Sequence, residues 1–110
     1  MRIETYFTVD EADPATMMEA ATVVVVDVLR ATTTLVEALA NGARGIYPTA
    51  STEEAVKLAH SLGREDTLLC GERKGSKVEG FDLGNSPREF TRAAVEGKRL
   101  VMSTTNGTRA

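Results

Sequence analysis

The chain has 110 residues, of which 42% are hydrophobic and 26% charged, a composition typical of a globular protein with one buried core. Its formal net charge of −3 and sequence pI near 5.2 provide no general attraction for nucleic acid or an anionic membrane, so neither is expected as a partner. A single cysteine, Cys70, excludes an intramolecular disulfide and, with the absence of an apolar signal segment at Met1, favours a cytoplasmic location.

Two strands and a short helix are predicted in the amino-terminal part. Residues 2–9 alternate in polarity and predict a first strand. Asp13 and Pro14 are typical of a helix N-cap and first turn, so a short helix is expected to run through Met17 and Met18 to Ala21. Residues 23–26 are four valines, a run that is typical of a strand buried on both faces of a parallel sheet.

Charged and hydroxyl side chains follow the valine run directly. Because ligands of open α/β sheets bind outside the carboxyl ends of the strands, Asp27 and Arg30 are candidate substrate contacts. A helix is expected over residues 33–41, with an apolar face that includes Leu35, Val36 and Leu39. The unpaired N–H groups of its first turn could hold an anion. Alternatively, the threonines there only cap the helix.

Two further strands, with a helix between them, are predicted in the middle of the chain. Residues 45–47 form a brief strand, residues 51–63 a helix with its capping box, and residues 67–70 a strand. Glu72 and Arg73 lie nearest the end of this strand and are the better candidates for a site, whereas Lys74 and Lys77 could be solvated surface only. The spacing of a Walker phosphate loop is absent, which disfavours a nucleotide triphosphatase.

The last third of the chain supplies a loop, a helix, a strand and a polar segment. Asp82 and Asn85, on a glycine-flanked loop, are available to a ligand or a metal ion. A helix is expected over residues 86–97 and a strand over residues 98–103. Residues 104–109 would offer N–H and O–H donors to an oxyanion. The Asn-Gly pair there could instead be a hairpin turn.

Strands alternating with helices imply βαβ crossovers and therefore an α/β fold, a largely parallel sheet with helices on both faces. We expect residues 1–110 to form a single α/β domain. The sequence stops at Ala110, where the pattern calls for a following helix, so we expect a sheet that is incomplete at the C-terminal end and a chain that is the N-terminal portion of a longer one. Carboxylates and arginines at neighbouring strand ends would suit a divalent ion bridging to a phosphate.

Four blocks of the sequence, VDVLRATTT (26–34), GER (71–73), GFDLGNSP (80–87) and TTNGTR (104–109), closely resemble the 2-phosphosulfolactate phosphatase (ComB) family in order and spacing. The resemblance implies a Mg²⁺-dependent phosphatase that hydrolyses 2-phosphosulfolactate to sulfolactate and phosphate in coenzyme M biosynthesis. A related phosphorylated sulfonate or carboxylate is an alternative substrate. Family members are about twice this length, so the resemblance covers the amino-terminal part of a longer phosphatase.

The residues in these blocks are assigned to three roles. The candidate catalytic residues are Asp27, Glu72 and Arg30, and the candidate Mg²⁺ ligands are Asp27, Glu72 and Asp82. The candidate substrate-binding residues are Arg30, Thr32, Thr33, Arg73, Asn85, Ser86, Thr104, Thr105, Asn106, Gly107, Thr108 and Arg109.

Two mechanistic alternatives and a second function remain open from the sequence. An activated water is the favoured nucleophile over Asp27, because Leu29 stands where aspartyl-phosphate enzymes of the haloacid-dehalogenase pattern carry a second carboxylate. The alternative function is a non-catalytic α/β module that binds a phosphorylated or sulfonated metabolite, with Asp27 as a helix N-cap. Formation of a homo-oligomer is left open.

Overall fold

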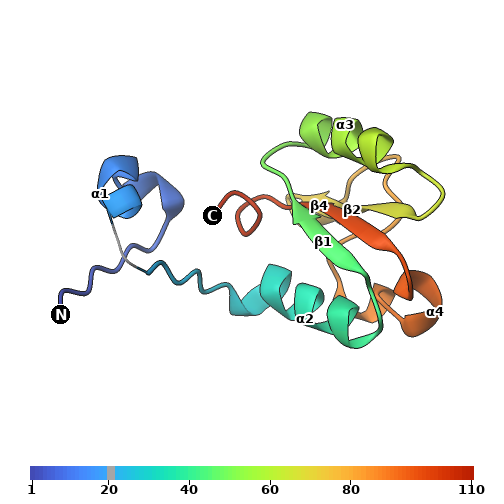
Figure 1. Cartoon of the computed structure of the whole chain (residues 1–110), viewed down its shortest axis with the longest axis horizontal. Helices are drawn as coiled ribbons and strands as arrows, with labels where there is room; N and C mark the ends of the chain where they lie inside the picture. Colours follow the sequence, from blue (N-terminus) through green and yellow to red (C-terminus); the bar gives the residue numbers. More distant parts are fainter. Residues whose placement is uncertain (20–21) are drawn as a thin grey trace.

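The computed structural model of the protein describes residues 1–19 and 22–110. Its sheet has the order β1-β4-β2-β3, with β1 over Gly45–Pro48, β2 over Thr67–Arg73, β3 over Ser76–Lys77 and β4 over Arg99–Ser103 (Figure 1). Strand β4 lies parallel to both β1 and β2, and β3 is antiparallel to β2. The predicted α/β fold with a largely parallel sheet is confirmed, and the β2–β3 hairpin is an addition that the sequence pattern did not predict.

Helices cover both faces of this sheet. Helix α3 (Thr52–Leu62) lies on one face, and α2 (Thr33–Ala40) and α4 (Arg92–Val95) lie on the other (Figure 1). The side chain of Ser51 caps α3 by accepting the N–H of Glu54 at 3.1 Å, as the capping box predicts. None of the helices in residues 1–19 and 22–110 is long and apolar enough to cross a bilayer.

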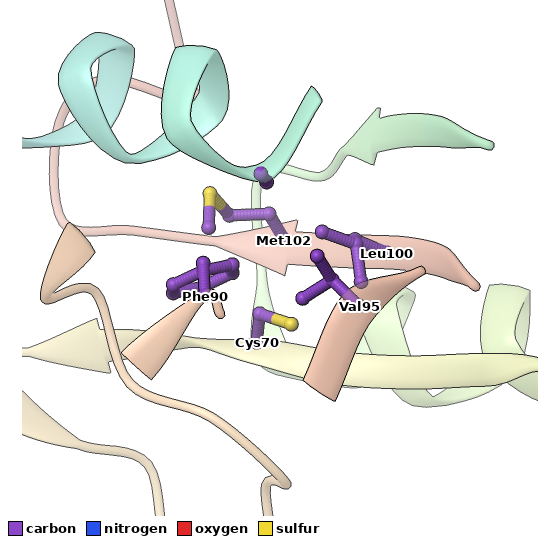
Figure 2. Packing of buried hydrophobic residues seen from close by; sticks show 6 residues of the cluster. Cys70, Phe90, Val95, Leu100 and Met102 are labelled. Carbon is purple, nitrogen blue, oxygen red and sulfur yellow. The ribbon is translucent and has the colours of Figure 1, made fainter. Parts of the chain in front are cut away.

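Two apolar clusters fill the space between the sheet and its helices. The cluster beneath α2 and α4 is built from Ala38, Cys70, Phe90, Val95, Leu100 and Met102 (Figure 2). The cluster beneath α3 is built from Ala55, Ala59, Leu69, Phe81 and Val101. Successive residues of a strand point to opposite faces, so β2 and β4 each contribute to both clusters. Burial raises the pKa of the Cys70 thiol, which therefore stays protonated and serves as core filling.

The predicted helix over residues 86–97 is divided in two. A 3₁₀ turn, η3 (Pro87–Glu89), comes first, and the Glu89 carboxylate accepts the backbone N–H of Ser86 at 3.3 Å in the expected capping box. The chain then leaves helical geometry at Phe90, whose side chain is fully buried in the core. Thr91 caps the second piece, α4, by accepting the N–H of Ala94 at 3.3 Å. Phe90 thus fills the core at the break between the two helical pieces.

Both strands predicted in the amino-terminal part are wrong. Residues 2–9 form no strand and lead into the 3₁₀ turn η1 (Val9–Glu11), and the valine run is unpaired, with Val24 and Val26 77% and 78% exposed. A strand requires a hydrogen-bonded neighbour, and no segment within the described residues pairs with either run. Helix α1 (Pro14–Glu19) confirms the predicted short helix, although its expected extension to Ala21 lies outside the described residues.

Helix α2 forms where it was predicted but buries a different face. A kinked turn, η2 (Val28–Thr32), in which Leu29 is extended, precedes it. Thr34 and Ala38 are buried on the sheet, whereas Val36 and Leu39 of the predicted apolar face are exposed. Ala38 packs in the apolar cluster on the sheet, and the Thr34 hydroxyl donates to the carbonyl of Asn85 in the loop before η3. This orientation places the start of α2 above the carboxyl ends of β2 and β4.

Candidate functional site

A pocket of about 340 Å³ lies at the carboxyl edge of the sheet. Pairing of Gly71 with Ser103 sets β2 and β4 in register, so the residues that follow them leave the sheet side by side. The pocket is lined by Asp27, Leu29, Arg30, Ala31, Glu72, Lys74, Gly75, Asn85, Thr104, Thr105, Asn106 and Gly107. The structure therefore brings together segments from all four blocks of the sequence that resemble the phosphatase family.

Glu72 is almost fully buried in the wall of the pocket, and both of its carboxylate oxygens accept hydrogen bonds. The backbone N–H of Thr105 donates to Oε1 at 2.6 Å, and the Thr105 hydroxyl and the Gly75 N–H donate to Oε2 at 2.9 Å each. Burial alone would raise the pKa of this carboxyl, but these donors and the nearby Arg73 charge outweigh it and lower the pKa. Glu72 is therefore ionised at neutral pH.

Two other side chains in the pocket carry oxygen atoms that lack a partner. The Oδ1 atoms of Asp27 and Asn85 are buried, and neither accepts a hydrogen bond from a group in residues 1–19 and 22–110. Asp27 precedes the η2 turn, but its side chain makes no capping hydrogen bond, so an N-cap role does not account for it. Asn85 is held in place by its backbone carbonyl, which accepts the hydroxyl of Thr34 on α2 at 3.0 Å. Both oxygens are thus available to a ligand in the pocket.

The segment after β4 is folded on itself by two threonines. The N–H of Thr104 donates to the hydroxyl oxygen of Thr108 at 2.8 Å, and the N–H of Thr108 donates to the hydroxyl oxygen of Thr104 at 3.0 Å. The N–H of Arg109 donates to the carbonyl of Asn106 at 3.0 Å. These bonds form a compact turn that places residues 104–107 against the pocket, and β4 ends here without a hairpin partner in the described part of the chain.

Arg73 does not line the pocket, although it is adjacent to Glu72. Alternation along β2 places Glu72 on the face of the sheet that α2 covers and Arg73 on the opposite face. There the Arg73 guanidinium donates to the hydroxyl of Ser103 at 2.7 Å and to the carbonyl of Glu72 at 2.8 Å. The structure gives Arg73 a role in joining β2 to β4.

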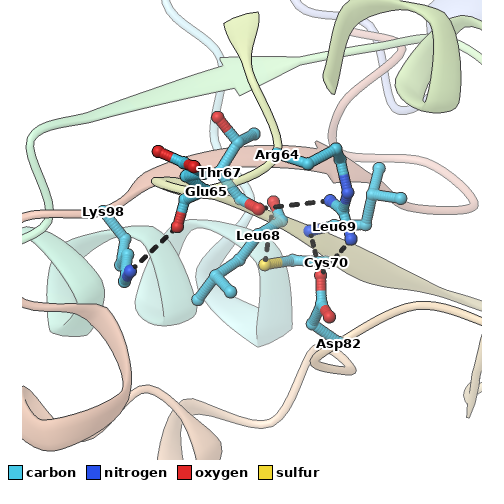
Figure 3. A network of polar contacts seen from close by, with 8 residues as sticks. All are labelled: Arg64, Glu65, Thr67, Leu68, Leu69, Cys70, Asp82 and Lys98. Carbon is cyan, nitrogen blue, oxygen red and sulfur yellow. Dashed lines mark hydrogen bonds and ion pairs between the residues drawn. The ribbon is translucent and has the colours of Figure 1, made fainter. Parts of the chain in front are cut away.

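Asp82 is also separated from the pocket, which it does not line. Its carboxylate accepts the N–H of Leu69 at 2.8 Å and pairs with Arg64 at 3.2 Å, beside β2 (Figure 3). These partners fix the 78–83 loop to the sheet. Within the described residues, no group of three or more His, Cys, Asp or Glu side chains is close enough to hold a metal ion, so the structure does not assemble Asp27, Glu72 and Asp82 into one centre.

The remaining sequence-predicted residues lie around the pocket and not in its wall. Thr32 and Thr33 are exposed, and Thr32 makes no side-chain cap to α2 while the Thr33 hydroxyl donates to the carbonyl of Val28. Ser86 serves the capping box of η3. Arg109 pairs with Asp10 at 3.4 Å.

Arg109 instead lines a second pocket. This pocket, of about 270 Å³, shares Asp27, Asn106 and Gly107 with the first. Its other lining residues include apolar side chains from the amino-terminal segment, Phe7 and Val9 among them. The two pockets therefore adjoin along a common wall, with Arg30 in one and Arg109 in the other.

Lys74 is the cationic residue of the pocket that sequence reasoning set aside as surface. It lies in the β2–β3 turn with φ of +52°, a left-handed conformation that is uncommon for residues other than glycine. The signal that could have indicated it was the Lys74-Gly75 pair followed by a short polar run, which is a hairpin pattern. A hairpin would have directed the turn, and Lys74 with it, toward the end of β4.

Comparison with known proteins agrees with the four sequence blocks that meet in this pocket. The family model for 2-phosphosulpholactate phosphatase matches residues 6–110. The chain belongs to this family. Because the match covers every residue that lines the first pocket, the pocket lies within the part of the family that the chain represents.

Relatives in the family are named probable 2-phosphosulfolactate phosphatases. The chain is 50% identical over 95 residues to one from Thermotoga petrophila, which covers 86% of the chain and 40% of that relative. It is 53% identical over 89 residues to one from Clostridium acetobutylicum, covering 81% and 37%, and 45% identical over 107 residues to one from Caldanaerobacter subterraneus, covering 97% and 43%. The chain thus spans about two fifths of the length of the relatives it matches.

Proposed function

We propose that the chain carries the phosphate-binding part of a Mg²⁺-dependent phosphatase that hydrolyses 2-phosphosulfolactate or a related phosphorylated sulfonate or carboxylate. The observation that carries the proposal is the pocket itself, where two unpartnered acceptor oxygens, from Asp27 and Asn85, lie with the cations Arg30 and Lys74. Acceptors for a cation beside donors for an anion suit a phosphate ester bound through a metal ion. Family membership and the relatives' names support the choice of substrate.

The residues of the pocket fit Mg²⁺ in part. The Oδ1 atoms of Asp27 and Asn85 are hard oxygen ligands with no other partner, and they would hold the ion together with water and substrate phosphate. Glu72 is a poorer ligand than predicted because both its oxygens already accept hydrogen bonds, and Asp82 lies elsewhere. When bound, Mg²⁺ would polarise the phosphoryl oxygens and acidify a bound water.

The cations would divide the anionic groups of the substrate between them. Arg30 and Lys74 line the first pocket and would neutralise phosphate oxygens, whereas Arg109 in the adjoining pocket would bind the sulfonate or carboxylate. Hydrolysis then adds water across the ester P–O bond, so that phosphorus gains the water oxygen and the alcohol oxygen leaves with a proton. Asp27 would orient this water and would not itself attack phosphorus.

Two further parts of the proposal concern the cellular setting. We propose that the reaction belongs to coenzyme M biosynthesis, which the family resemblance supports. A cytoplasmic location is supported by the single cysteine, Cys70, which is free and buried.

Release of inorganic phosphate from synthetic 2-phosphosulfolactate tests the proposal. We expect the full-length protein to release phosphate with Mg²⁺ and to lose this activity in EDTA, with the Thermotoga petrophila relative assayed in parallel to validate the substrate. Binding of the ester without any release of phosphate would support the non-catalytic module instead. Release that is unchanged by EDTA would contradict the role of the metal ion.

A further inference from the structure

A polar link joins the β2–β3 turn to the segment that follows β4. The link is formed by the Glu72 carboxylate, which accepts the N–H and hydroxyl of Thr105 and the N–H of Gly75 at 2.6 to 2.9 Å. Glu72 is only 8% exposed, so these donors replace the water that an ionised carboxylate requires. A carboxylate offers about four lone-pair positions, and three of them are used here.

The same link fixes the conformation of the turn itself. Thr105 Oγ1, which donates to Glu72, also accepts the N–H of Lys74 at 3.4 Å. Lys74, in its left-handed conformation, is therefore bonded directly to the segment after β4, and its neighbour Gly75 is bonded to Glu72. Lys74, Gly75 and Thr105 all line the pocket, so the link sets the distance between two of its walls.

We propose that Glu72 is a positioning residue of this site, which holds Lys74 and residues 104–107 at the separation that the phosphate ester requires, and that it is not a Mg²⁺ ligand or a general base. The inference rests on the proposed function and deepens it, because it gives the two carboxylates different roles. Asp27 would bind the metal ion, and Glu72 would hold the walls of the pocket in place. Glu72 acts through its bonds to Thr105 and Gly75.

A double-mutant cycle distinguishes a positioning residue from a metal ligand. We expect Glu72→Gln and Thr105→Val each to raise KM for the phosphate ester by about tenfold with a smaller effect on kcat, because each variant weakens the same link. Thr105→Val removes the hydroxyl bond to Glu72 and keeps the backbone N–H bond. The double variant should be no worse than the more damaged single variant. Thr105→Ser retains the hydroxyl and should restore KM to near the wild-type value.

The Mg²⁺ concentration for half-maximal activity is the readout that a metal ligand would change. We expect this Mg²⁺ concentration to stay within about twofold of the wild-type value in Glu72→Gln. Even loss of an outer-shell partner of a metal ligand typically weakens metal binding by about 10-fold or more, so loss of a ligand itself should raise the concentration at least as much. A large rise in this concentration in Glu72→Gln but not in Thr105→Val would overturn the proposal. Additive effects of the two substitutions on KM would overturn it as well.

Amide hydrogen exchange tests the link without any assay of phosphate release. The N–H groups of Gly75 and Thr105 donate to Glu72 and should exchange slowly in the wild type and at least tenfold faster in Glu72→Gln. Glu79→Gln is the matched control, because Glu79 is exposed in the nearby loop and does not line the pocket. Unchanged protection of both amides in Glu72→Gln would refute the positioning role, even if the protein proved inactive. An inactive wild type that shows the expected protection of both amides would refute the phosphatase function alone.

Discussion

Gly107 packs so closely against Asp27 that a Cβ atom added to the glycine would lie 2.5 Å from Asp27 Oδ2 and 2.6 Å from the Cβ of Ala31. The segment after β4 therefore reaches the end of the valine run only because residue 107 has no side chain. Two sequence blocks that are about 80 residues apart are brought into direct contact at the pocket in this way.

Gly107→Ala should disrupt this contact. The added methyl group must displace either the Asp27 carboxylate or the turn after β4, so we expect kcat/KM for the phosphate ester to fall at least tenfold, about 1.4 kcal/mol of transition-state stabilisation. Steady-state kinetics of phosphate release measure kcat/KM for the variant and the wild type. Gly45→Ala is the control, since a Cβ at Gly45 would meet only the Tyr47 ring at 3.5 Å, an ordinary contact. Equal effects of the two substitutions would contradict the role of Gly107.

Lys74→Ala should weaken substrate binding. Lys74 lines the pocket and would contribute one of its two cations, so we expect KM for the phosphate ester to rise about fivefold to tenfold, with the effect decreasing as salt is added. Lys77→Ala is a matched control, because Lys77 is an exposed lysine on β3 outside the pocket wall. Kinetics at low and high ionic strength would check both variants. A larger rise in KM for Lys77→Ala than for Lys74→Ala would contradict the placement of Lys74 in the pocket by the β2–β3 turn.

Asp82→Ala should affect stability and not the metal ion. Removal of the carboxylate leaves the N–H of Leu69 and the guanidinium of Arg64 without this partner, which we expect to cost about 1 kcal/mol in the free energy of unfolding, since the side chain is partly exposed. The Mg²⁺ dependence of phosphate release should be unchanged. Asp66→Ala, at an exposed carboxylate, should alter stability by less than about 0.5 kcal/mol. Denaturant unfolding compares the two, and a changed Mg²⁺ requirement in Asp82→Ala would restore Asp82 as a ligand.

The lowered pKa of Glu72 predicts how the stability of the protein depends on pH. Its pKa is lower in the folded protein than in the unfolded chain, so its stabilising contribution is complete above the unfolded value, about 4.3, and is lost as the pH falls through the folded value. We therefore expect the melting temperature of the wild type to fall in acid more steeply than that of Glu72→Gln, which lacks the titrating group. Thermal unfolding from pH 7 to pH 3 measures this difference. Parallel curves for the two proteins would contradict the lowered pKa.

The central sheet was predictable because its elements carry strong local signals. The capping box at Ser51, the stop at Gly63 and the apolar run before Cys70 each specify an element with little help from tertiary contacts. The amino-terminal strands were mispredicted for the opposite reason. Apolar runs such as residues 23–26 show that a segment can form a strand, but pairing requires a neighbour that local sequence does not identify.

The site was predictable as an edge of the sheet but not as a set of contacts. Asp27 and Arg30 were expected near residues 104–107, and all of them line the first pocket, although the strand that was expected to deliver Asp27 does not form. Residues 104–107 follow β4, whose carboxyl end does lie at this edge of the sheet. Arg73 was placed there too, since the prediction ignored the alternation that separates it from Glu72. Asp82 was also placed there, and the structure holds it elsewhere through bonds from Leu69 and Arg64. Such tertiary hydrogen bonds set the direction of a loop and cannot be identified from local sequence.

Phosphate release from 2-phosphosulfolactate by the wild type and by Asp27→Asn, at saturating Mg²⁺, tests the central claim most directly. Asp27→Asn keeps the size of the side chain and removes its charge, and Asp66→Asn makes the same exchange at an exposed carboxylate outside the pocket. We predict release by the wild type and by Asp66→Asn, and a loss of at least 100-fold in Asp27→Asn, in the range of about 10²–10⁴ typical for a positioned acid–base group. Equal release by the wild type and Asp27→Asn, or no release by the wild type, would contradict the account.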